Sequence, residues 1–234
     1  GVVPELAARN HVFHIDKITK KALKKAGLGL SDIDAIASTA GPGLIGGLLV
    51  GLSFAKTLAQ ANKLPFFAVN HLEGHVLTAR LISEINFPYL VLLISGGHSN
   101  FYFIRNINQY TFLGGTLDDA VGEAFDKIGK VLGLKFPGGP EVEKKALKGN
   151  EKAFVFPKPL LRKTNEDLNL SFSGLKSHII KLVKDNKSNL RSKNFIEDIS
   201  ASFQKTISDI LLIKLKRAIN YCNAKLPDYE NIVV

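Results

Sequence analysis

Cysteine and long uninterrupted apolar runs are scarce in this sequence, and each shortage excludes a class of protein. The 234 residues include one cysteine, Cys222, so an internal disulfide is excluded and a buried thiol in a reducing, cytoplasmic compartment is predicted. The longest apolar segment, residues 35–55, carries no charge, but Pro42 between two glycines interrupts it. The 13 uncharged residues after Pro42 are too few to span a bilayer, so no membrane partner is expected. A buried strand, a turn and a buried helix are predicted instead.

Acidic residues are outnumbered, with 21 Asp and Glu against 31 Lys and Arg, and the formal net charge is +10. Most of this excess lies after residue 134, which predicts a surface there that faces a polyanion. The basic residues that form this predicted surface include Lys181, Lys184, Lys187, Arg191 and Lys193. A solvated basic face without any partner explains the same charge equally well.

The first part of the chain, residues 1–87, alternates helical and strand patterns. Apolar residues recur at helical spacing until two glycines, at 27 and 29, stop the pattern. Two buried strands are predicted over residues 32–39 and 65–70, separated by a glycine-rich turn and a helix over residues 48–59. This order predicts a parallel sheet covered by helices.

The second part, residues 88–234, opens with three consecutive strand signals and so with a predicted meander. The strand signals cover residues 89–95, 100–107 and 109–115. Helices are predicted over about 118–133, after the sequence SFSG, and over about 194–222, with a turn and an irregular stretch from 135 to about 170. The final residues, ENIVV, enter a strand and stop. We therefore expect a fragment of a longer protein, cut at its C-terminus and also at its N-terminus.

The sequence GPGLIG, residues 41–46, matches the G-x-G-x-x-G pattern between a predicted strand and a predicted helix. A dinucleotide site also needs an acidic residue at the end of the next strand, but that strand ends at Asn70. Recognition of a ribose in the manner of NAD-binding proteins therefore has no candidate residue. An anion site at the helix start and a close contact between helix and strand both remain open.

Two further glycine pairs are candidates for contact with a ligand. The first pair lies in LLISGGHSN, residues 92–100, of which residues 93–100 are the candidate segment. The tight turn at 95–97 can direct backbone N–H groups at a phosphate. A plain hairpin turn needs the same glycines. The sequence FPGGP, residues 136–140, is predicted to be a second such loop. Asp126 on the preceding helix can bind a ribose hydroxyl or form an ion pair with Lys130.

The sequence NHLEGHV, residues 70–76, places His71 and His75 four positions apart on one face of a predicted helix. Two imidazoles so placed can bind one zinc or iron ion, although a pair without metal is equally consistent with the spacing. The zinc-protease pattern needs a glutamate directly after the first histidine. Here Glu73 stands two places after it, where it can form a capping box with Asn70 as the N-cap.

Seven stretches, taken together and in order over residues 1 to about 177, closely resemble the TsaD family. They are GVVPELAARNH, AGPGLIGGLLVG, HLEGH, LLISGGH, GEAFDK, PGGP and SFSGLK. The family comprises the threonylcarbamoyltransferases of transfer RNA modification, formerly described as O-sialoglycoprotein endopeptidases. The wording of the stretches is most similar to the bacterial branch.

The resemblance implies an α/β protein with the two-lobed actin-like ATPase (ASKHA) fold, incomplete at both termini. Residues 1–87 would be the first lobe without its opening meander, and residues 88–234 the second lobe without its C-terminal part. The implied enzyme is an acyltransferase that moves the threonylcarbamoyl group from threonylcarbamoyl-AMP to N6 of adenosine 37 in tRNAs that read codons beginning with A. The fragment alone is expected to be inactive. The implied cofactor is one divalent metal ion per subunit, iron or zinc. The implied partners are tRNA, a TsaB-like paralogue and a TsaE-like ATPase.

The resemblance also implies roles for individual residues. His71 and His75 correspond to metal ligands, with a third ligand expected outside this chain. Residues in the positions that contact the acyl-adenylate are Leu93, Ile94, Ser95, Gly96, Gly97, Asp126, Gly139 and Glu143, the last standing where many relatives have aspartate. No general base is identified. Three alternatives stay open: a metalloprotease with Glu73 as its base, a non-catalytic scaffold paralogue, and a sugar kinase or chaperone-type ATPase of the same fold.

Overall fold

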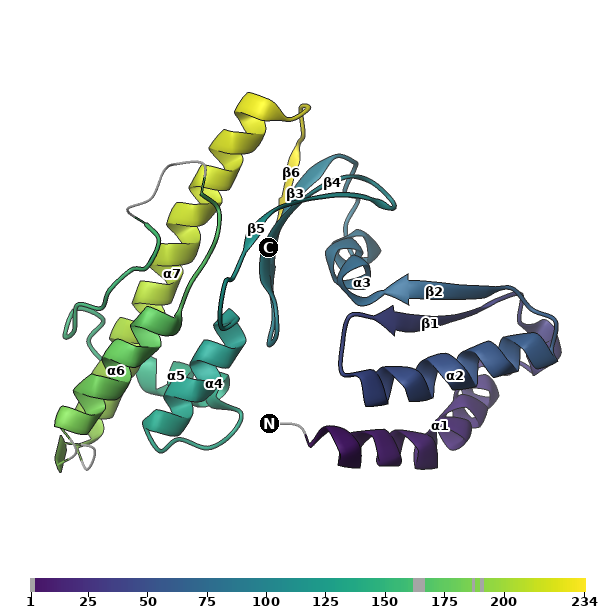
Figure 1. Cartoon of the computed structure of the whole chain (residues 1–234), viewed down its shortest axis with the longest axis horizontal. Helices are drawn as coiled ribbons and strands as arrows, with labels where there is room; N and C mark the ends of the chain where they lie inside the picture. The colour runs from purple at the N-terminus through teal and green to yellow at the C-terminus, as the bar shows by residue number, and fades with distance from the viewer. Residues whose placement is uncertain (1–2, 162–166, 187, 190–191) are drawn as a thin grey trace. The chain divides into compact units, whose positions relative to one another are not determined.

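The computed structural model describes residues 3–161, 167–186, 188–189 and 192–234. The chain divides into two compact units, Gly1–Ser83 and Glu84–Val234, whose elements are labelled in Figure 1. Both units combine helices with a sheet, which confirms the α/β class. Their assignment to two ASKHA lobes, 1–87 and 88–234, stays a prediction. Within the described residues, no helix has the length and apolar character that a membrane crossing requires.

The first unit consists of helices and a two-stranded parallel sheet. Its elements are α1 (Pro4–Ala26), η1 (Leu30–Asp32), β1 (Ile36–Gly41), α2 (Ile45–Ala61), β2 (Phe66–Asn70), α3 (His71–Leu77) and η2 (Thr78–Leu81). Strands β1 and β2 pair in parallel, as the order of the sequence signals predicts. Helix α1 ends at the predicted glycine, because Gly27 adopts the left-handed conformation with φ of 71°.

The prediction that β1, β2 and α2 are buried is wrong. Phe67 in β2 is 59% exposed, and Ala55 and Ala59 are the buried residues of α2. The two strands form a sheet with each other, and α2 packs along one side of it, as Figure 1 shows. Side chains that point away from α2 therefore stay exposed, although the segment is as apolar as a buried one.

The glycine-rich start of α2 serves close packing. A Cβ atom at Gly46 would lie 3.3 Å from the Cβ of Ala8 in α1, and one at Gly51 would lie 3.6 Å from Ser38 Oγ in β1. Small residues thus let α2 approach both a neighbouring helix and the strand before it. Gly46, the last residue of GPGLIG, thus lies against α1, whereas the glycine next to the strand is Gly51, outside that sequence. The choice between an anion site and a close contact of helix and strand for GPGLIG stays open.

The second unit contains a four-stranded sheet and four helices among its described residues. Its elements are β3 (Tyr89–Ile94), β4 (Ser99–Asn106), β5 (Gln109–Gly115), α4 (Val121–Val131), α5 (Gly138–Ala146), α6 (Ser173–Asp185), α7 (Lys193–Lys225) and β6 (Asn231–Val233). The sheet order is β5-β4-β3-β6. The antiparallel meander β3–β5 is confirmed, and β6 pairs in parallel with β3.

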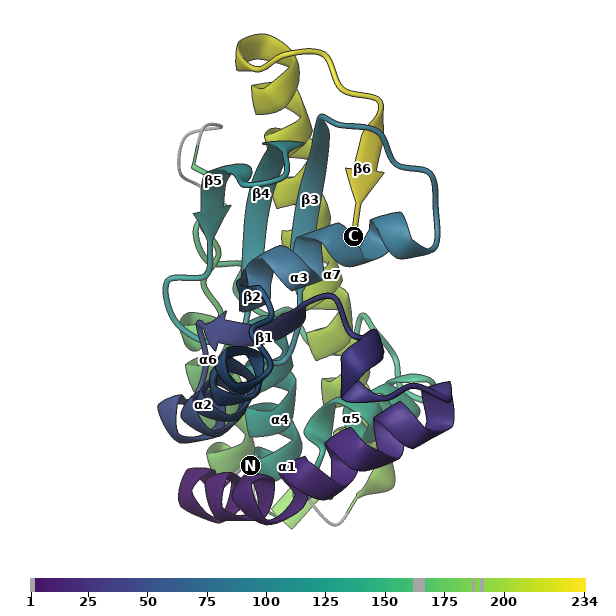
Figure 2. The same cartoon turned by 90° about the vertical axis from the view of Figure 1, so that its right-hand side faces the viewer.

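The core of the second unit lies between the sheet and the helices. Figure 2 shows the four strands side by side with α7 behind them. Phe101 and Phe103 of β4, Ile128 of α4 and Phe203 of α7 are fully buried in one cluster. Cys222 belongs to this cluster too, and burial raises the pKa of its thiol to about 11. The predicted buried thiol is thus confirmed, and it is a poor nucleophile at neutral pH.

Two helix boundaries differ from those predicted. Helix α4 begins at Val121 and not near residue 118, because Asp118 and Asp119 hold other segments. Helix α5, over 138–146, was expected to be a turn and irregular chain. The glycine pair is its first turn, with Pro137 as N-cap, so the predicted second glycine loop is wrong. The charged segment 184–193 includes residues 187 and 190–191, which lie outside the described residues.

Candidate functional site

The two histidines of the first unit sit on a short helix that begins directly after a strand. Asn70 ends β2 and caps α3, because its Oδ1 accepts hydrogen bonds from the backbone N–H groups of Leu72, at 2.9 Å, and Glu73, at 3.3 Å. The Asn70 half of the predicted capping box is therefore confirmed. The return bond from the Glu73 side chain stays a prediction.

The imidazoles of His71 and His75 converge at one point of the α3 surface. Their Nε2 atoms are 3.2 Å apart, and their ring centroids are 4.5 Å apart. Two nitrogen ligands at ordinary zinc distances in a tetrahedral site are separated by about 3.3 Å. The pair therefore fits two positions of one metal site. No third His, Cys, Asp or Glu side chain joins them within the described part of the chain.

The turn at residues 95–97, called the SGG turn below, joins β3 to β4 in the second unit. Ser95 N–H donates to the His98 carbonyl at 2.8 Å, and His98 N–H donates to Ser95 Oγ at 3.1 Å. A Cβ atom at Gly96 or Gly97 would meet no atom within 4 Å, so the outer side of this backbone is open. The predicted hairpin turn is confirmed, and its contact with a ligand stays a prediction.

The residues that lead into the SGG turn have different environments. Leu93 is 9% exposed, whereas Ile94 is 38% exposed. A contact between the ligand and Leu93 would therefore be made by its backbone, because the side chain is buried. Ile94 can offer both its backbone and its side chain.

Helix α4 begins against the SGG turn. The buried Ser99 Oγ accepts a hydrogen bond of 2.9 Å from the backbone N–H of Val121, the first residue of the helix. A Cβ atom at Gly122 would lie 2.7 Å from Gly96 Cα and 3.0 Å from the Ser95 carbonyl oxygen. Because real Cβ atoms do not approach backbone this closely, only glycine fits at position 122.

The same side of α4 holds the start of α5. Asp126 Oδ1 accepts a hydrogen bond of 2.7 Å from Gly138 N–H. A Cβ atom at Gly138 would lie 2.7 Å from Asp126 Cα, and one at Gly129 would lie 2.8 Å from Gly138 Cα. Asp126 thus anchors the first turn of α5. From the sequence, the alternatives for Asp126 were a ribose contact and an ion pair with Lys130.

The remaining predicted contacts of this unit follow on α5. A Cβ atom at Gly139 would be 4.0 Å from Phe125 Cβ, so this glycine also lies next to α4. Glu143 is exposed one turn further along α5. The structure therefore brings the SGG turn, Asp126 and Gly139 to one helix, α4, and places Glu143 slightly apart.

Sequence reasoning missed the glycines that make these contacts. Gly122, Asp126 and Gly129 follow one another at spacings of four and three, so they share one face of α4. Two glycines seven positions apart on one helical face, Gly122 and Gly129, were the available signal. The motif GEAFDK drew attention to Asp126 alone.

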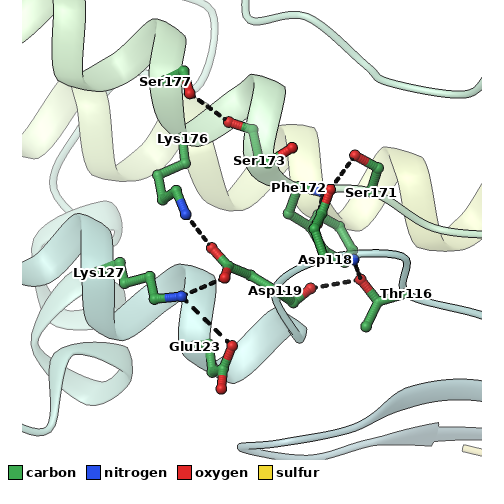
Figure 3. A network of polar contacts seen from close by, with 10 residues as sticks. All are labelled: Thr116, Asp118, Asp119, Glu123, Lys127, Ser171, Phe172, Ser173, Lys176 and Ser177. Atoms are coloured by element: carbon green, nitrogen blue, oxygen red, sulfur yellow. Dashed lines mark hydrogen bonds and ion pairs between the residues drawn. The ribbon is translucent and has the colours of Figure 1, made fainter.

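A cluster of charged residues surrounds the segment before α4, as Figure 3 shows. The Asp119 carboxylate pairs with the ammonium groups of Lys127 in α4 and Lys176 in α6. The Asp119 side chain is 13% exposed. Partial burial works against ionisation, but the hydrogen bonds from both lysines outweigh it and hold the Asp119 pKa below its usual value. Glu123 lies 3.6 Å from the same Lys127 ammonium.

Asp118 attaches the segment SFSG to the same place. Its carboxylate accepts hydrogen bonds from Ser171 Oγ at 2.5 Å and from Phe172 N–H at 2.8 Å. Burial again opposes the ionised form, but these hydrogen bonds hold the Asp118 pKa below its usual value. Residues 118–119 therefore tie the end of the meander to both α4 and α6.

Comparison with known proteins identifies the family. The chain matches the model of the TsaD family, described as tRNA N6-adenosine threonylcarbamoyltransferase, over residues 1–230. The protein of that name from Rickettsia prowazekii is 52% identical over 98% of this chain and 58% of its own length. Its namesake from Pelagibacter ubique is 54% identical over 93% of this chain and 59% of its own length.

The chain is an α/β protein that spans about three fifths of the length of these curated relatives. It belongs to the TsaD family. Among solved structures, a Pseudomonas aeruginosa protein described as similar to peptidase YEAZ shares 22% identity over 44% of this chain and 48% of its own. Its TM-score of 0.33 is too low for an inference about the fold.

Proposed function

We propose that the protein transfers the threonylcarbamoyl group from threonylcarbamoyl-AMP to N6 of adenosine 37 in tRNAs that read codons beginning with A, with release of AMP. The observation that carries this proposal is the family match over residues 1–230. Identities of 52–54% with relatives named for this reaction support it. The two units would be parts of the two lobes of an actin-like ATPase fold. The glycine-turn meander β3–β5 supports that assignment for the second unit.

The reaction is an acyl transfer in which the nucleotide is the leaving group. The N6 amine attacks the carbamoyl carbon, the bond from that carbon to the phosphate oxygen breaks, and the amine loses a proton as AMP departs. The protein must orient the acyl-phosphate and hold the nucleotide, because positioning supplies much of the rate for a weak nucleophile.

The second unit offers the groups that would bind the nucleotide. The exposed backbone of Gly96 and Gly97 leaves room for a phosphate to approach the N–H groups of the SGG turn. Asp126, Gly139 and Glu143 would lie along the adenosine part. Asp126 already accepts one hydrogen bond from Gly138. The carboxylate has further acceptor capacity for a ribose hydroxyl.

His71 and His75 would hold one divalent metal ion, iron or zinc. Their Nε2 separation of 3.2 Å supports this assignment. When bound, such an ion would supply a Lewis acid next to the group being transferred. The short α3 and its Asn70 cap would orient both imidazoles toward that ion.

The proposed partners are tRNA, a TsaB-like paralogue and a TsaE-like ATPase. Lys181 and Lys184 lie on α6 and Lys193 begins α7, so three of the five basic residues expected to face tRNA have defined places. Lys187 and Arg191 lie outside the described residues. Contacts of lysines with phosphates predict that tRNA affinity falls steeply as salt rises.

A transfer assay with two tRNAs tests the proposed function. The purified full-length protein and its partners are supplied with threonylcarbamoyl-AMP and a tRNA with adenosine at position 37, or the same tRNA with guanosine there. Modified nucleoside is expected from the first tRNA only. Absence of product from the adenosine tRNA, under conditions where a Rickettsia relative forms it, would contradict the proposal.

The metalloprotease alternative has less support. The backbone N–H of Glu73 is bonded to the Asn70 cap at the third position of α3, where its side chain favours the helix start over a role as base. A peptidase assay that compares wild type with Glu73→Gln separates the two functions. Peptide cleavage that disappears in Glu73→Gln would favour the protease.

A further inference from the structure

Helix α4 carries contacts at both ends of one face, and neither contact leaves space for adjustment. Gly122 meets the SGG turn, and Gly129 meets Gly138 at the start of α5. Both contacts join backbone to backbone, with no flexible side chain between the partners. A small shift of α4 along its axis would therefore open one contact or close the other.

The N-terminus of α4 lacks a side-chain cap of its own. Its N-cap residue is Ala120, which makes no side-chain hydrogen bond to the helix. The bond from Val121 N–H to the buried Ser99 Oγ joins the helix to β4. The segment 116–119 supplies further contacts at the helix start.

Asp119 supplies contacts of that kind. Its carboxylate pairs with Lys127, which lies in the second turn of α4, and with Lys176 in the first turn of α6. Its carbonyl oxygen accepts a hydrogen bond of 2.6 Å from Thr116 Oγ1. We call Asp119, Lys127 and Lys176 the lysine clamp, and Figure 3 shows the two ammonium groups on either side of the carboxylate.

The ion pairs of the lysine clamp are partly shielded from solvent, so they can help to fix the position of α4. The side chains of Asp119 and Lys176 are 13% and 23% exposed, whereas Lys127 is 46% exposed. Ion pairs between exposed side chains contribute little, but partial burial and shared partners strengthen them. The Asp119–Lys176 pair is therefore the principal arm, and Lys127 is the secondary one.

We propose that the lysine clamp consists of positioning residues for the nucleotide site: it fixes the position of α4, and α4 fixes the SGG turn and the start of α5. The naming of these two segments as nucleotide contacts rests on the proposed function. The mechanical link from clamp to turn does not, because it follows from the contacts at Gly122 and Gly129. No clamp side chain needs to touch the substrate for this effect.

The test compares four variants of the full protein with wild type. Lys176→Met and Asp119→Asn each break the principal arm. Lys176→Arg keeps a cation that can pair with Asp119. Lys130→Met is the matched control, because it removes an exposed lysine from α4 that makes no ion pair among the described residues.

Amide hydrogen exchange measures, without any ligand, whether the lysine clamp stabilises α4 and the SGG turn. In Lys176→Met and Asp119→Asn, exchange is expected to accelerate at residues 95–97 and 121–123, while β3 and the middle of α7 keep their wild-type rates. Lys176→Arg and Lys130→Met are expected to match wild type. Unchanged exchange at these residues, or a uniform acceleration over the whole second unit, would overturn the positioning role.

The affinity for AMP, measured by calorimetry, shows whether loss of the clamp weakens the nucleotide site. Lys176→Met is expected to weaken AMP binding by roughly 10-fold, and the double variant Asp119→Asn/Lys176→Met by no more than Asp119→Asn alone, because Asp119→Asn already breaks the ion pair that Lys176→Met removes. Wild-type affinity in Lys176→Met would overturn the proposal. If wild type itself binds no AMP, the nucleotide assignment of the proposed function fails, and the exchange rates still decide the clamp.

Discussion

The two units hold their candidate ligand residues by different means. In the first unit, two histidines stand on the seven residues of α3, which the Asn70 side chain caps. In the second unit, the SGG turn and the start of α5 are held by backbone contacts to α4 and by ion pairs around Asp119. The difference is one between a site that depends on a local helix start and a site that depends on tertiary packing.

Individual helical glycines of the two units differ in a similar way. A Cβ atom at Gly47 in α2 or at Gly74 in α3 would meet no atom within 4 Å, whereas one at Gly122 would meet backbone at 2.7 Å. A glycine in an open helical position costs stability and can be replaced. A glycine that touches neighbouring backbone cannot be replaced without moving that backbone. Alanine substitutions at Gly47 and at Gly122 should therefore differ in sign as well as in size.

Removal of one histidine should give the largest effect. His71→Ala leaves a single imidazole, so zinc affinity is expected to fall by about 100-fold or more, since loss of a group that only supports a ligand already costs about 10- to 100-fold. Competition with a chromophoric chelator measures the affinity. His11→Ala, on the exposed face of α1, is the matched control and should bind zinc as wild type does. Equal zinc affinity in His71→Ala would contradict the metal assignment.

Gly122→Ala should destabilise the second unit. The added methyl group would overlap Gly96 and the Ser95 carbonyl, so the free energy of unfolding is expected to fall by about 1–3 kcal/mol. Denaturant unfolding measures it. Gly47→Ala in the first unit should instead stabilise by about 0.5–1 kcal/mol, because the helix gains alanine and nothing is displaced. The same sign for both variants would refute the contrast between the units.

The sequence predicted the elements well wherever one local pattern determined them. Alternating apolar residues and glycine or asparagine turns were enough for β3, β4 and β5, and helical spacing was enough for α1 and α7. Helix α5 was missed because Pro137 and two glycines are typical of a turn. Here the first turn of a helix uses them, since Gly138 must lie against Asp126 Cα.

Tertiary environment could not be predicted in the same way. The apolar residues of β2 suggested burial, but apolar content does not reveal what covers a strand, and Phe67 is 59% exposed. Asp119 and Lys176 are 57 residues apart in the sequence, so no local spacing could join them. The histidine pair was predictable because the fixed rise and rotation of one helix determine its geometry.

Loss of the Asn70 cap should give a smaller effect that stays within the first unit. Asn70→Ala removes the acceptor for two N–H groups of α3, which is expected to cost about 1 kcal/mol of helix stability and to weaken zinc binding severalfold. Hydrogen exchange of the α3 amides measures the first effect. Asn62→Ala, which removes the side chain at the end of α2, should leave α3 exchange unchanged. Unaltered exchange in Asn70→Ala would show that packing holds α3.

Acid should weaken the second unit through its lowered carboxyl pKa values. The Asp119 pKa lies below 3.8 in the folded protein, so its ion pairs contribute fully above that pH and are lost as pH falls through the folded pKa. Asp119→Asn should therefore show a shallower loss of stability below about pH 4, by roughly 1 kcal/mol. Thermal unfolding between pH 7 and pH 3 measures the slope. Parallel curves for wild type and variant would exclude this contribution.

The most direct measurement of the proposed function is the yield of N6-threonylcarbamoyladenosine in tRNA, quantified by mass spectrometry after reaction with threonylcarbamoyl-AMP and the partner proteins. The variant His71→Ala/His75→Ala is compared with wild type and with His11→Ala/His14→Ala, which removes two histidines from α1. We expect full yield from wild type and from the α1 variant, and almost none from the α3 variant. Wild-type yield from His71→Ala/His75→Ala would contradict a metal-assisted transfer at this pair.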